Sequence, residues 1–425
     1  MQKIYIDCTH TYYSGLNTGI QRVVRNIVKK SSFINDTSIN IVPVILYNDK
    51  YIEINELPVV SYTKKKINIK NYLKKLYVKI RNIISIIPFF KKILYSPSLT
   101  TYLNRSYDLI AFNYLKKPKN NKKVFFKDKD ILILLDATWL DSNFKLLEEL
   151  KQKKVFLISI VYDIIPITHS RYCSDDLSRA YSLWLNKIYP LADAFISISK
   201  TVEKELVSFM QNNYKDINKK FFDHFLLGVD FKDIQYTPNT LDAKYKNIFI
   251  KDKTYITIST LEPRKNHEYL LDVFEKLWDS GIDVTYVIIG RLGWKIDKLL
   301  KRIKNHKELD KRLFLFNHID DNALIYAYKN SKAMIFASYA EGFGLPIIES
   351  LHYNLQVLAS DIPIHREVGH SYVTYFDLAK KETLIKIIKE NNFNKDLNKF
   401  KYIDWEESTK QLITKSLKVT KNNEA

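Results

Sequence analysis

Cysteine is nearly absent from this chain, which has only two, Cys8 and Cys173, in 425 residues. Two thiols so far apart in the sequence make neither a disulfide framework nor a zinc-binding cluster. This usage is typical of a protein kept in a reducing cytoplasm. Apolar cores must therefore hold the fold together, and 46% hydrophobic residues are enough to build them.

Long apolar runs are also missing. No run approaches the roughly 18 residues that a helix needs to cross a bilayer. The first residues, Met1-Gln2-Lys3-Ile4-Tyr5-Ile6-Asp7, lead directly into a strand-like pattern without the apolar stretch of a signal peptide. We therefore expect a cytoplasmic protein, soluble or peripherally attached to the inner face of the cytoplasmic membrane.

Acidic residues are too few to balance the basic ones, and the formal net charge is +20. Such a surplus favours a polyanionic partner, although part of it reflects a lysine-rich composition. Residues 63–94 contain many lysines, interleaved with Leu, Ile and Phe, and no acidic residue. This segment predicts a basic amphipathic insertion that binds an anionic membrane surface. The alternative is an inserted helix that packs on the first domain with its lysines in solvent.

Glycine is scarce as well, with nine in the whole chain. Each one is therefore expected to mark a tight turn or a close backbone approach. Three pairs, at 15/19, 290/293 and 342/344, follow strand-like runs. Loops after strands are where α/β proteins bind ligands, so these pairs are candidate site positions.

Short apolar strands alternate with helical stripes along most of the chain, which predicts parallel sheets covered on both faces. Strands are expected at 3–6, 40–46, 131–135, 155–162 and 194–197, and then at 255–259, 284–289, 313–316, 334–337, 356–359 and 373–376. We expect a first domain at 1–228, a linker at 229–250 and a second domain at 251–400. A helix in 401–425 is expected to cross back toward the first domain.

The segment Glu341-Gly342-Phe343-Gly344-Leu345 lies between an expected strand and an expected helix, with Pro346 in the first helical turn. A glycine-lined helix N-terminus presents free N–H groups and a positive dipole end, which favours a phosphate. Glu341 before the helix and Glu349 one turn inside it could accept hydrogen bonds from hydroxyls of a sugar nucleotide. The alternative is an ordinary helix start with incidental carboxylates.

A second loop, 259–266, also joins a strand to a helix and contains Thr260, Arg264 and Lys265. Arginine can neutralise a diphosphate with its planar fork and lysine as a point charge. Taken alone, such a pair is more often solvated loop charge.

With these neighbours, 341–349 resembles the E-x7-E motif of family 4 retaining glycosyltransferases, the glycosyl transferases group 1. Residues 359–369 are similar to the strand and loop that follow in that family. The resemblance implies an α/β GT-B fold, in which two doubly wound Rossmann-like domains face each other across a cleft. It also implies that Glu341 approaches the donor sugar, that Glu349 binds the nucleotide ribose and that Arg264 and Lys265 contact the donor diphosphate. The implied donor-binding residues include Thr260, Gly342, Phe343, Gly344 and Leu345.

Two further loops resemble the family less specifically. Gly290 and Arg291 lie in a loop similar to the one near the nucleotide base, although a plain turn explains it as well. Asn17-Thr18-Gly19-Ile20-Gln21-Arg22 resembles the T-G-I-Q-R signature of a bacterial subset. There Gly19 could admit the donor phosphate or the acceptor and Arg22 could contact either. A structural helix cap is the alternative.

The expected strand at 155–162 ends where many family members carry a His followed by an Asp. Here Tyr162 stands in the position of that His, while Asp163 matches the Asp. His169 is close but out of register. We therefore expect Asp163 to lie nearest the acceptor hydroxyl, where it could accept a proton or orient that group.

These features predict a retaining, metal-independent hexosyltransferase that needs no cofactor besides its nucleoside-diphosphate sugar. The expected acceptor is a lipid-linked or growing surface polysaccharide, and the T-G-I-Q-R subset implies mannose from a GDP donor. One alternative is a basic nucleic-acid-binding or membrane-associated scaffold of the same fold, but no nucleic-acid recognition motif is present. Another is a glycoside hydrolase or phosphorylase, although a hydrolase would not need Arg264 and Lys265.

Overall fold

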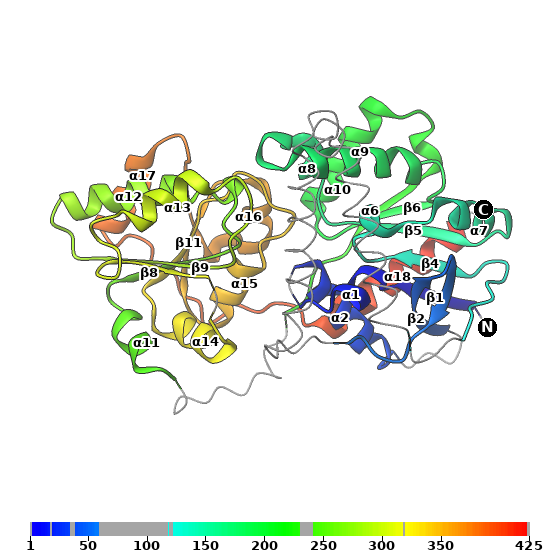
Figure 1. The fold of residues 1–425 in the computed structure, drawn as a ribbon, viewed down its shortest axis with the longest axis horizontal. Helices are drawn as coiled ribbons and strands as arrows, with labels where there is room; N and C mark the ends of the chain where they lie inside the picture. The colour runs from blue at the N-terminus through cyan, green and yellow to red at the C-terminus, as the bar shows by residue number, and fades with distance from the viewer. Residues whose placement is uncertain are drawn as a thin grey trace, which may run out of the picture.

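The computed structural model describes residues 2–17, 19–34, 39–58, 118, 122–229, 241–317 and 319–422. These residues form two α/β domains, each built on one sheet (Figure 1). The basic segment 63–94 lies outside the described residues, so its membrane-binding helix stays a prediction. No described helix is long and apolar enough to cross a membrane.

The first domain has a seven-stranded sheet in the order β3-β2-β1-β4-β5-β6-β7, parallel except for the β2–β3 hairpin. Its strands are β1 (Gln2–Asp7), β2 (Ile39–Tyr47), β3 (Lys50–Glu53), β4 (Ile131–Leu134), β5 (Phe156–Val161), β6 (Ala194–Ser197) and β7 (Phe221–His224). Its helices are α1 (Thr9–Ser14), α2 (Ile20–Ser31), α6 (Thr138–Asp141), α7 (Phe144–Gln152), α8 (Ile165–Thr168), α9 (Asp175–Ile188) and α10 (Lys200–Asn213). The central strands β4, β5 and β6 are buried and mostly apolar because helices cover both faces of the sheet.

The second domain has a six-stranded sheet in the order β10-β9-β8-β11-β12-β13, parallel throughout. Its strands are β8 (Thr254–Ile258), β9 (Thr285–Ile289), β10 (Leu313–Phe316), β11 (Ala333–Phe336), β12 (Gln356–Ser360) and β13 (Thr374–Phe376). Its helices are α11 (Ala243–Ile248), α12 (His267–Asp279), α13 (Asp297–Lys304), α14 (Asp321–Asn330), α15 (Leu345–His352), α16 (Pro363–Gly369) and α17 (Lys381–Lys389).

Every strand expected from the sequence is present, and its ends differ by no more than one residue. The sequence did not indicate β3 and β7, which are short. It also placed the linker at 229–250, whereas α11 lies inside that range and packs Tyr245 against Phe316 of the second domain, with ring centroids 5.5 Å apart. The packed part of the second domain therefore begins at α11.

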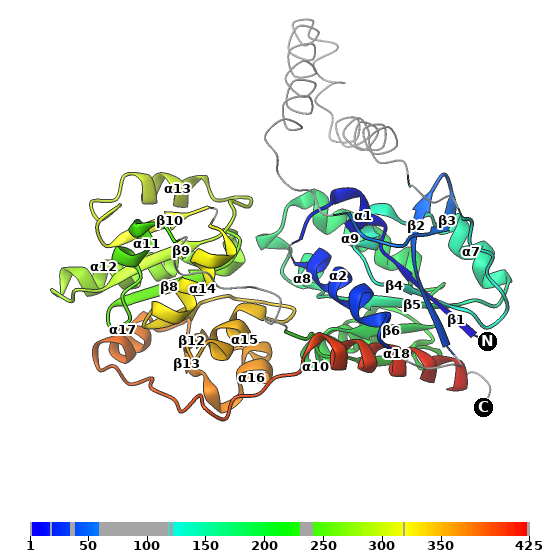
Figure 2. The same ribbon diagram turned by 90° about the horizontal axis from the view of Figure 1, so that it is seen from below.

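The last helix, α18 (Trp405–Asn422), runs along the first domain and packs against α2 (Figure 2). Its first residue, Trp405, is almost fully buried. Where the chain leaves the first domain it lies against the returning chain, and the Val229 N–H donates to the Ile403 carbonyl over 3.1 Å. A Cβ on Gly228 would lie 2.4 Å from the Asp404 carbonyl oxygen, so only glycine fits this double crossing.

Candidate functional site

The carboxyl ends of the parallel strands in the first sheet point toward the second domain (Figure 1). The loop after β5 and the loop after β11 touch at this boundary. A Cβ on Gly342 would lie 2.1 Å from the Tyr162 carbonyl oxygen and 3.2 Å from the Asp163 Cβ, so a side chain here would hold the loops apart. The hydroxyl of Ser199 also donates to the Gly342 carbonyl over 3.1 Å. Glycine at 342 thus lets Asp163 and Glu341 lie close together.

Glu341 is the centre of a buried charge cluster. Arg264 donates from Nη1 to Glu341 Oε2 over 2.7 Å and to the Ala340 carbonyl over 2.9 Å. Lys265 Nζ hydrogen bonds to the other oxygen of Glu341. Arg264 Nη2 forms a second ion pair, 2.7 Å long, with Glu262 Oε1. The two loops singled out from the sequence, 259–266 and 341–349, are therefore joined through their charged side chains.

The electrostatics of this cluster keep Glu341 ionised. Burial raises the pKa of the Glu341 carboxyl, but Arg264 and Lys265 outweigh it and hold that pKa well below its usual range. Burial and the neighbouring Arg264 lower the pKa of the Lys265 ammonium. Burial also raises the pKa of the Glu262 carboxyl. In the absence of ligand, the carboxylates neutralise the two cations that a diphosphate would need.

Asp163 faces this cluster from the first domain. Burial raises the pKa of its carboxyl, and Arg264 partly offsets that effect. Its Oδ1 accepts a hydrogen bond from the Ile165 N–H over 3.0 Å, which fixes the carboxylate at the start of α8. The neighbouring Tyr162 is buried and donates its hydroxyl to the Leu135 carbonyl over 2.7 Å. Tyr162 is thus a packing residue, and Asp163 is the polar group at this strand end.

Glu349 is buried in α15 and already has two partners. Arg22 Nη1 from the first domain lies 2.6 Å from Glu349 Oε1. The hydroxyl of Tyr328 donates to Glu349 Oε2 over 2.7 Å. Gly19 is the N-cap of α2, just before Arg22, and nothing lies within 4 Å of where its Cβ would be. The structure therefore brings the first-domain signature against the second carboxylate of the 341–349 segment.

The remaining candidates lie around the same edge of the second sheet. Gly344 is the N-cap of α15 with φ 99°, a left-handed value that favours glycine. Phe343 turns its side chain into the core near Tyr402, so only its backbone is left for a ligand. Leu345 is half-buried, and Thr260 and Arg291 are exposed. A Cβ on Gly290 would overlap the Ser259 carbonyl.

The 259–266 loop ends in a left-handed bend at Asn266. Asn266 lies at the N-cap position of α12, but its side chain makes no capping hydrogen bond. Its φ is 59°, a left-handed value, whereas capping residues ordinarily have an extended backbone. The left-handed bend instead lets the 3-10 turn Pro263–Lys265 end directly before α12.

Several residues at the boundary gave no sequence signal. Glu367 in α16 accepts hydrogen bonds from the Lys200 N–H over 2.8 Å and the Thr201 N–H over 2.7 Å, and so caps α10 across the boundary. Tyr172 of the first domain stacks on Tyr339, with centroids 5.2 Å apart and planes 6° from parallel. Such partners depend on how two domains meet, which no local pattern contains.

His10 and Asp141 form another pair that the sequence did not reveal. They lie in α1 and α6, after β1 and β4, and His10 Nδ1 is 3.0 Å from Asp141 Oδ2. Burial lowers the pKa of His10, but Asp141 raises it more, so the net pKa lies above its usual value. Both side chains are partly exposed at the carboxyl edge of the first sheet, where they can donate or accept hydrogen bonds.

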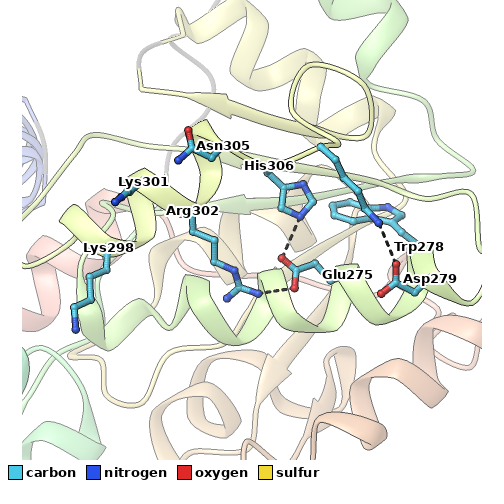
Figure 3. Close-up of a pocket in the computed structure, with 9 residues that line it drawn as sticks. Glu275, Trp278, Asp279, Lys298, Lys301, Arg302, Asn305 and His306 are labelled. Carbon is cyan, nitrogen blue, oxygen red and sulfur yellow. Dashed lines mark hydrogen bonds and ion pairs between the residues drawn. The ribbon is translucent and has the colours of Figure 1, made fainter.

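A hollow of about 720 Å³ lies elsewhere, between α12 and α13 on the second domain (Figure 3). Several of its charged side chains pair with one another. The Glu275 carboxylate pairs with Arg302 Nη2 at 2.6 Å and with His306 Nε2 at 3.1 Å. None of the residues singled out from the sequence lines this hollow, so we place the candidate site at the domain boundary. Within the described part of the chain, no three His, Cys, Asp or Glu side chains are grouped to hold a metal ion.

Comparison with known proteins identifies a family for part of the chain. Residues 240–403 match the sequence model of the family described as glycosyl transferases group 1. The resemblance inferred from 341–349 is thus confirmed for this part of the chain, which contains Arg264, Lys265, Glu341 and Glu349. The N-terminal signature lies outside the matched residues.

Two relatives share part of the sequence. The serotype-specific mannosyltransferase WbdA of Escherichia coli is 28% identical over 316 residues, which cover 69% of this chain and 38% of the relative. The O-antigen chain mannosyltransferase RfbU of Salmonella typhimurium is 27% identical over 171 residues, covering 38% of this chain and 46% of the relative. The aligned part of the chain thus spans less than half the length of either relative.

Two solved structures share the fold over nearly the whole chain. Anabaena Alr3699/HepE in complex with UDP and glucose has a TM-score of 0.55 at 14% identity and is covered in full, as is this chain. Sucrose-phosphate synthase from Thermosynechococcus elongatus has a TM-score of 0.56 at 13% identity, covering 100% of this chain and 98% of that one. The chain has the GT-B fold expected from the sequence.

Proposed function

We propose that this protein is a retaining glycosyltransferase that moves a hexose from a nucleoside-diphosphate sugar to a lipid-linked or growing surface polysaccharide. The observation that carries the proposal is the Glu341 carboxylate, which Arg264 and Lys265 hold at the domain boundary next to Asp163. The names of WbdA and RfbU support mannose as the sugar and an O-antigen-like glycan as the product. The surplus of positive charge and residues 63–94 motivate attachment to an anionic membrane, which sedimentation with anionic liposomes tests.

In the proposed reaction, Arg264 and Lys265 exchange part of their contact with Glu341 for oxygens of the donor diphosphate. The bond between the anomeric carbon and the diphosphate oxygen breaks, and the acceptor oxygen bonds to that carbon on the same face. The hydroxyl proton ends on the departing diphosphate. Because negative charge grows on the leaving group, cations already in place stabilise the transition state and take the part of a metal ion.

The two carboxylates have different tasks in this proposal. Glu341 lies where the donor sugar meets the diphosphate, and its charge favours the electron-poor anomeric carbon of the transition state. Asp163 orients the acceptor hydroxyl from the first domain. Contact between the loops that carry them excludes water, which limits hydrolysis of the donor.

A thermal-shift screen of UDP, GDP, ADP and dTDP sugars tests the proposal, because a ligand of the folded state raises its stability by mass action. We expect GDP-mannose to stabilise the protein most, with and without a chelator. Transfer to a glycan acceptor should preserve the anomeric configuration, which NMR of the product reads directly.

Glu341→Gln sharpens the test. The variant should lose about a hundredfold to ten-thousandfold in transfer rate, the scale seen when a preorganised electrostatic contact is removed. It should bind the nucleoside diphosphate at least as well, since Arg264 and Lys265 lose their competing carboxylate. Glu390→Gln, at an exposed glutamate after α17, is the matched control. Release of free sugar from a glycan without any nucleotide would favour a hydrolase instead, and tight DNA binding without nucleotide-sugar binding would favour a scaffold.

A further inference from the structure

The ion pair between Arg22 and Glu349 joins the two domains. The second domain holds only one of the two carboxylate oxygens of Glu349, and the first domain holds the other. Glu349 Oε2 is anchored within its own domain by Tyr328, whose ring stacks on Tyr353 with centroids 5.3 Å apart. Glu349 Oε1 is held by Arg22, which lies in the first turn of α2 in the other domain. One oxygen of the carboxylate is therefore fixed at all times, and the other only while the domains are together.

The contact between Arg22 and Glu349 matters for the charge of the carboxylate because Glu349 is buried. The Glu349 side chain is 8% exposed and that of Arg22 31% exposed. A carboxylate so deeply buried is costly to keep ionised unless a cation and hydrogen-bond donors offset the lost hydration. Glu349 is the main cause that raises the pKa of the Arg22 guanidinium above its ordinary value. The pair is thus a charged contact in a shielded place rather than a solvated surface pair.

The remaining capacity of Glu349 matches the proposed donor. An ionised carboxylate accepts about four hydrogen bonds, and Arg22 and Tyr328 occupy two of these sites. The two free sites can take the two hydroxyls of a ribose. Removing Arg22 would leave one oxygen without its donor and let the carboxylate rotate about its last bond.

We propose that Arg22 is a positioning residue for Glu349, so that the ribose-binding carboxylate is complete only when the two domains are closed. This inference rests on the proposed function, in which Glu349 binds the ribose of the donor. Arg22 contacts neither the sugar nor the ribose. Its guanidinium orients Glu349 from the other domain, and donor binding and domain closure therefore favour each other.

The test compares a nucleoside diphosphate with its 2′,3′-dideoxy analogue by calorimetry, with GDP as the first probe and UDP as the second. We expect the wild-type protein to bind the dideoxy analogue at least tenfold more weakly. Arg22→Gln should bind the ordinary nucleotide about tenfold more weakly than wild type and discriminate less than threefold between the two. Both proteins should bind the dideoxy analogue equally well. Arg22→Lys, which keeps the charge without the fork, should recover part of the discrimination.

Arg302→Gln is the matched control, because the ion pairs of Arg302 with Asp272 at 2.7 Å and Glu275 at 2.6 Å lie within the second domain. It should behave as wild type in both titrations. If Arg22→Gln keeps the full preference for the ribosyl nucleotide, or binds it more tightly, Arg22 does not position Glu349. If wild type itself shows no preference for the ribosyl nucleotide, the role of Glu349 in the proposed function fails instead.

Discussion

At the scale of single residues, the charged side chains of the Glu341 cluster at the domain boundary are largely buried, and each forms an ion pair. Glu341 and Glu262 together neutralise Arg264 and Lys265, so in the proposed function a diphosphate would enter a site whose donors are already aimed. The arrangement costs stability, since burying charges is unfavourable even when they pair. In the proposed reaction, the same buried charges would stabilise a charged transition state, because no water has to reorient when charge moves.

Asp7, at the end of β1, should make the free energy of unfolding depend on pH. Burial raises the pKa of its carboxyl to about 7, while an unfolded aspartate titrates near about 3.9. Between these values the folded state binds more protons than the unfolded state, so stability falls as the pH rises from about 4 to 7. Asp7→Asn should remove this dependence, leaving the variant relatively more stable at pH 8 than at pH 4 by on the order of 2 to 4 kcal/mol.

Urea unfolding of both proteins at several pH values measures this difference. The hydrogen bonds from the Thr9 N–H and Thr9 hydroxyl to Asp7 Oδ1 can persist in the amide, which makes asparagine a mild substitution. Asp252→Asn, at an exposed position, is the control. Parallel stability curves for wild type and Asp7→Asn would show that Asp7 stays ionised in the folded protein.

At the scale of elements, α10 belongs to the first domain, but a residue of the second domain, Glu367, caps its N-terminus. Glu367 of α16 accepts from the first two N–H groups of α10, and its charge lies at the positive end of the helix dipole. Ser199 caps the same helix from within its own domain, over 3.1 Å to the Val202 N–H. The start of the helix therefore has a cap within its own domain, and we expect the contact from Glu367 to act mainly on domain closure.

Glu367→Ala should weaken closure by about 1 kcal/mol, the usual worth of a helix cap, with little effect on unfolding. Hydrogen exchange at the amides of Lys200 and Thr201 should become faster, and the radius of gyration in solution should increase. Glu390→Ala should change neither quantity. Unchanged exchange at these amides in Glu367→Ala would mean that the domains rarely use this contact in solution.

The elements themselves were largely predictable, because apolar runs between turn signals report burial on both faces of a sheet. The loops around Arg264 and Glu341 were predictable too, since each lies between a strand and a helix. The partners of Arg22 were not. Arg22 and Glu349 are 327 residues apart in the chain, and their contact depends on the angle between two domains. Tyr328 was missed because its position on α14 reads as ordinary helix core.

At the scale of the whole molecule, the two domains come into close backbone contact at Gly342. Gly342→Ala should force the β5 and β11 loops apart, because a methyl group would lie 2.1 Å from the Tyr162 carbonyl oxygen. We expect nucleotide binding to weaken, because Arg22 would hold Glu349 less well, and the transfer rate to fall at least tenfold, with a larger radius of gyration by X-ray scattering. Gly281→Ala, where the space around an added methyl group is open, is the control.

The place of α18 affects how the protein is made. The first domain is not complete when its seventh strand leaves the ribosome, since α18, at the far end of the chain, packs against α2 and β7. The whole second domain is translated in between, which takes on the order of ten to forty seconds at ordinary elongation rates. During that interval the surface of α2 that α18 will cover stays open to solvent or to chaperones. The second domain has all its strands before α18 appears, so it can fold first during synthesis although it comes second in the chain.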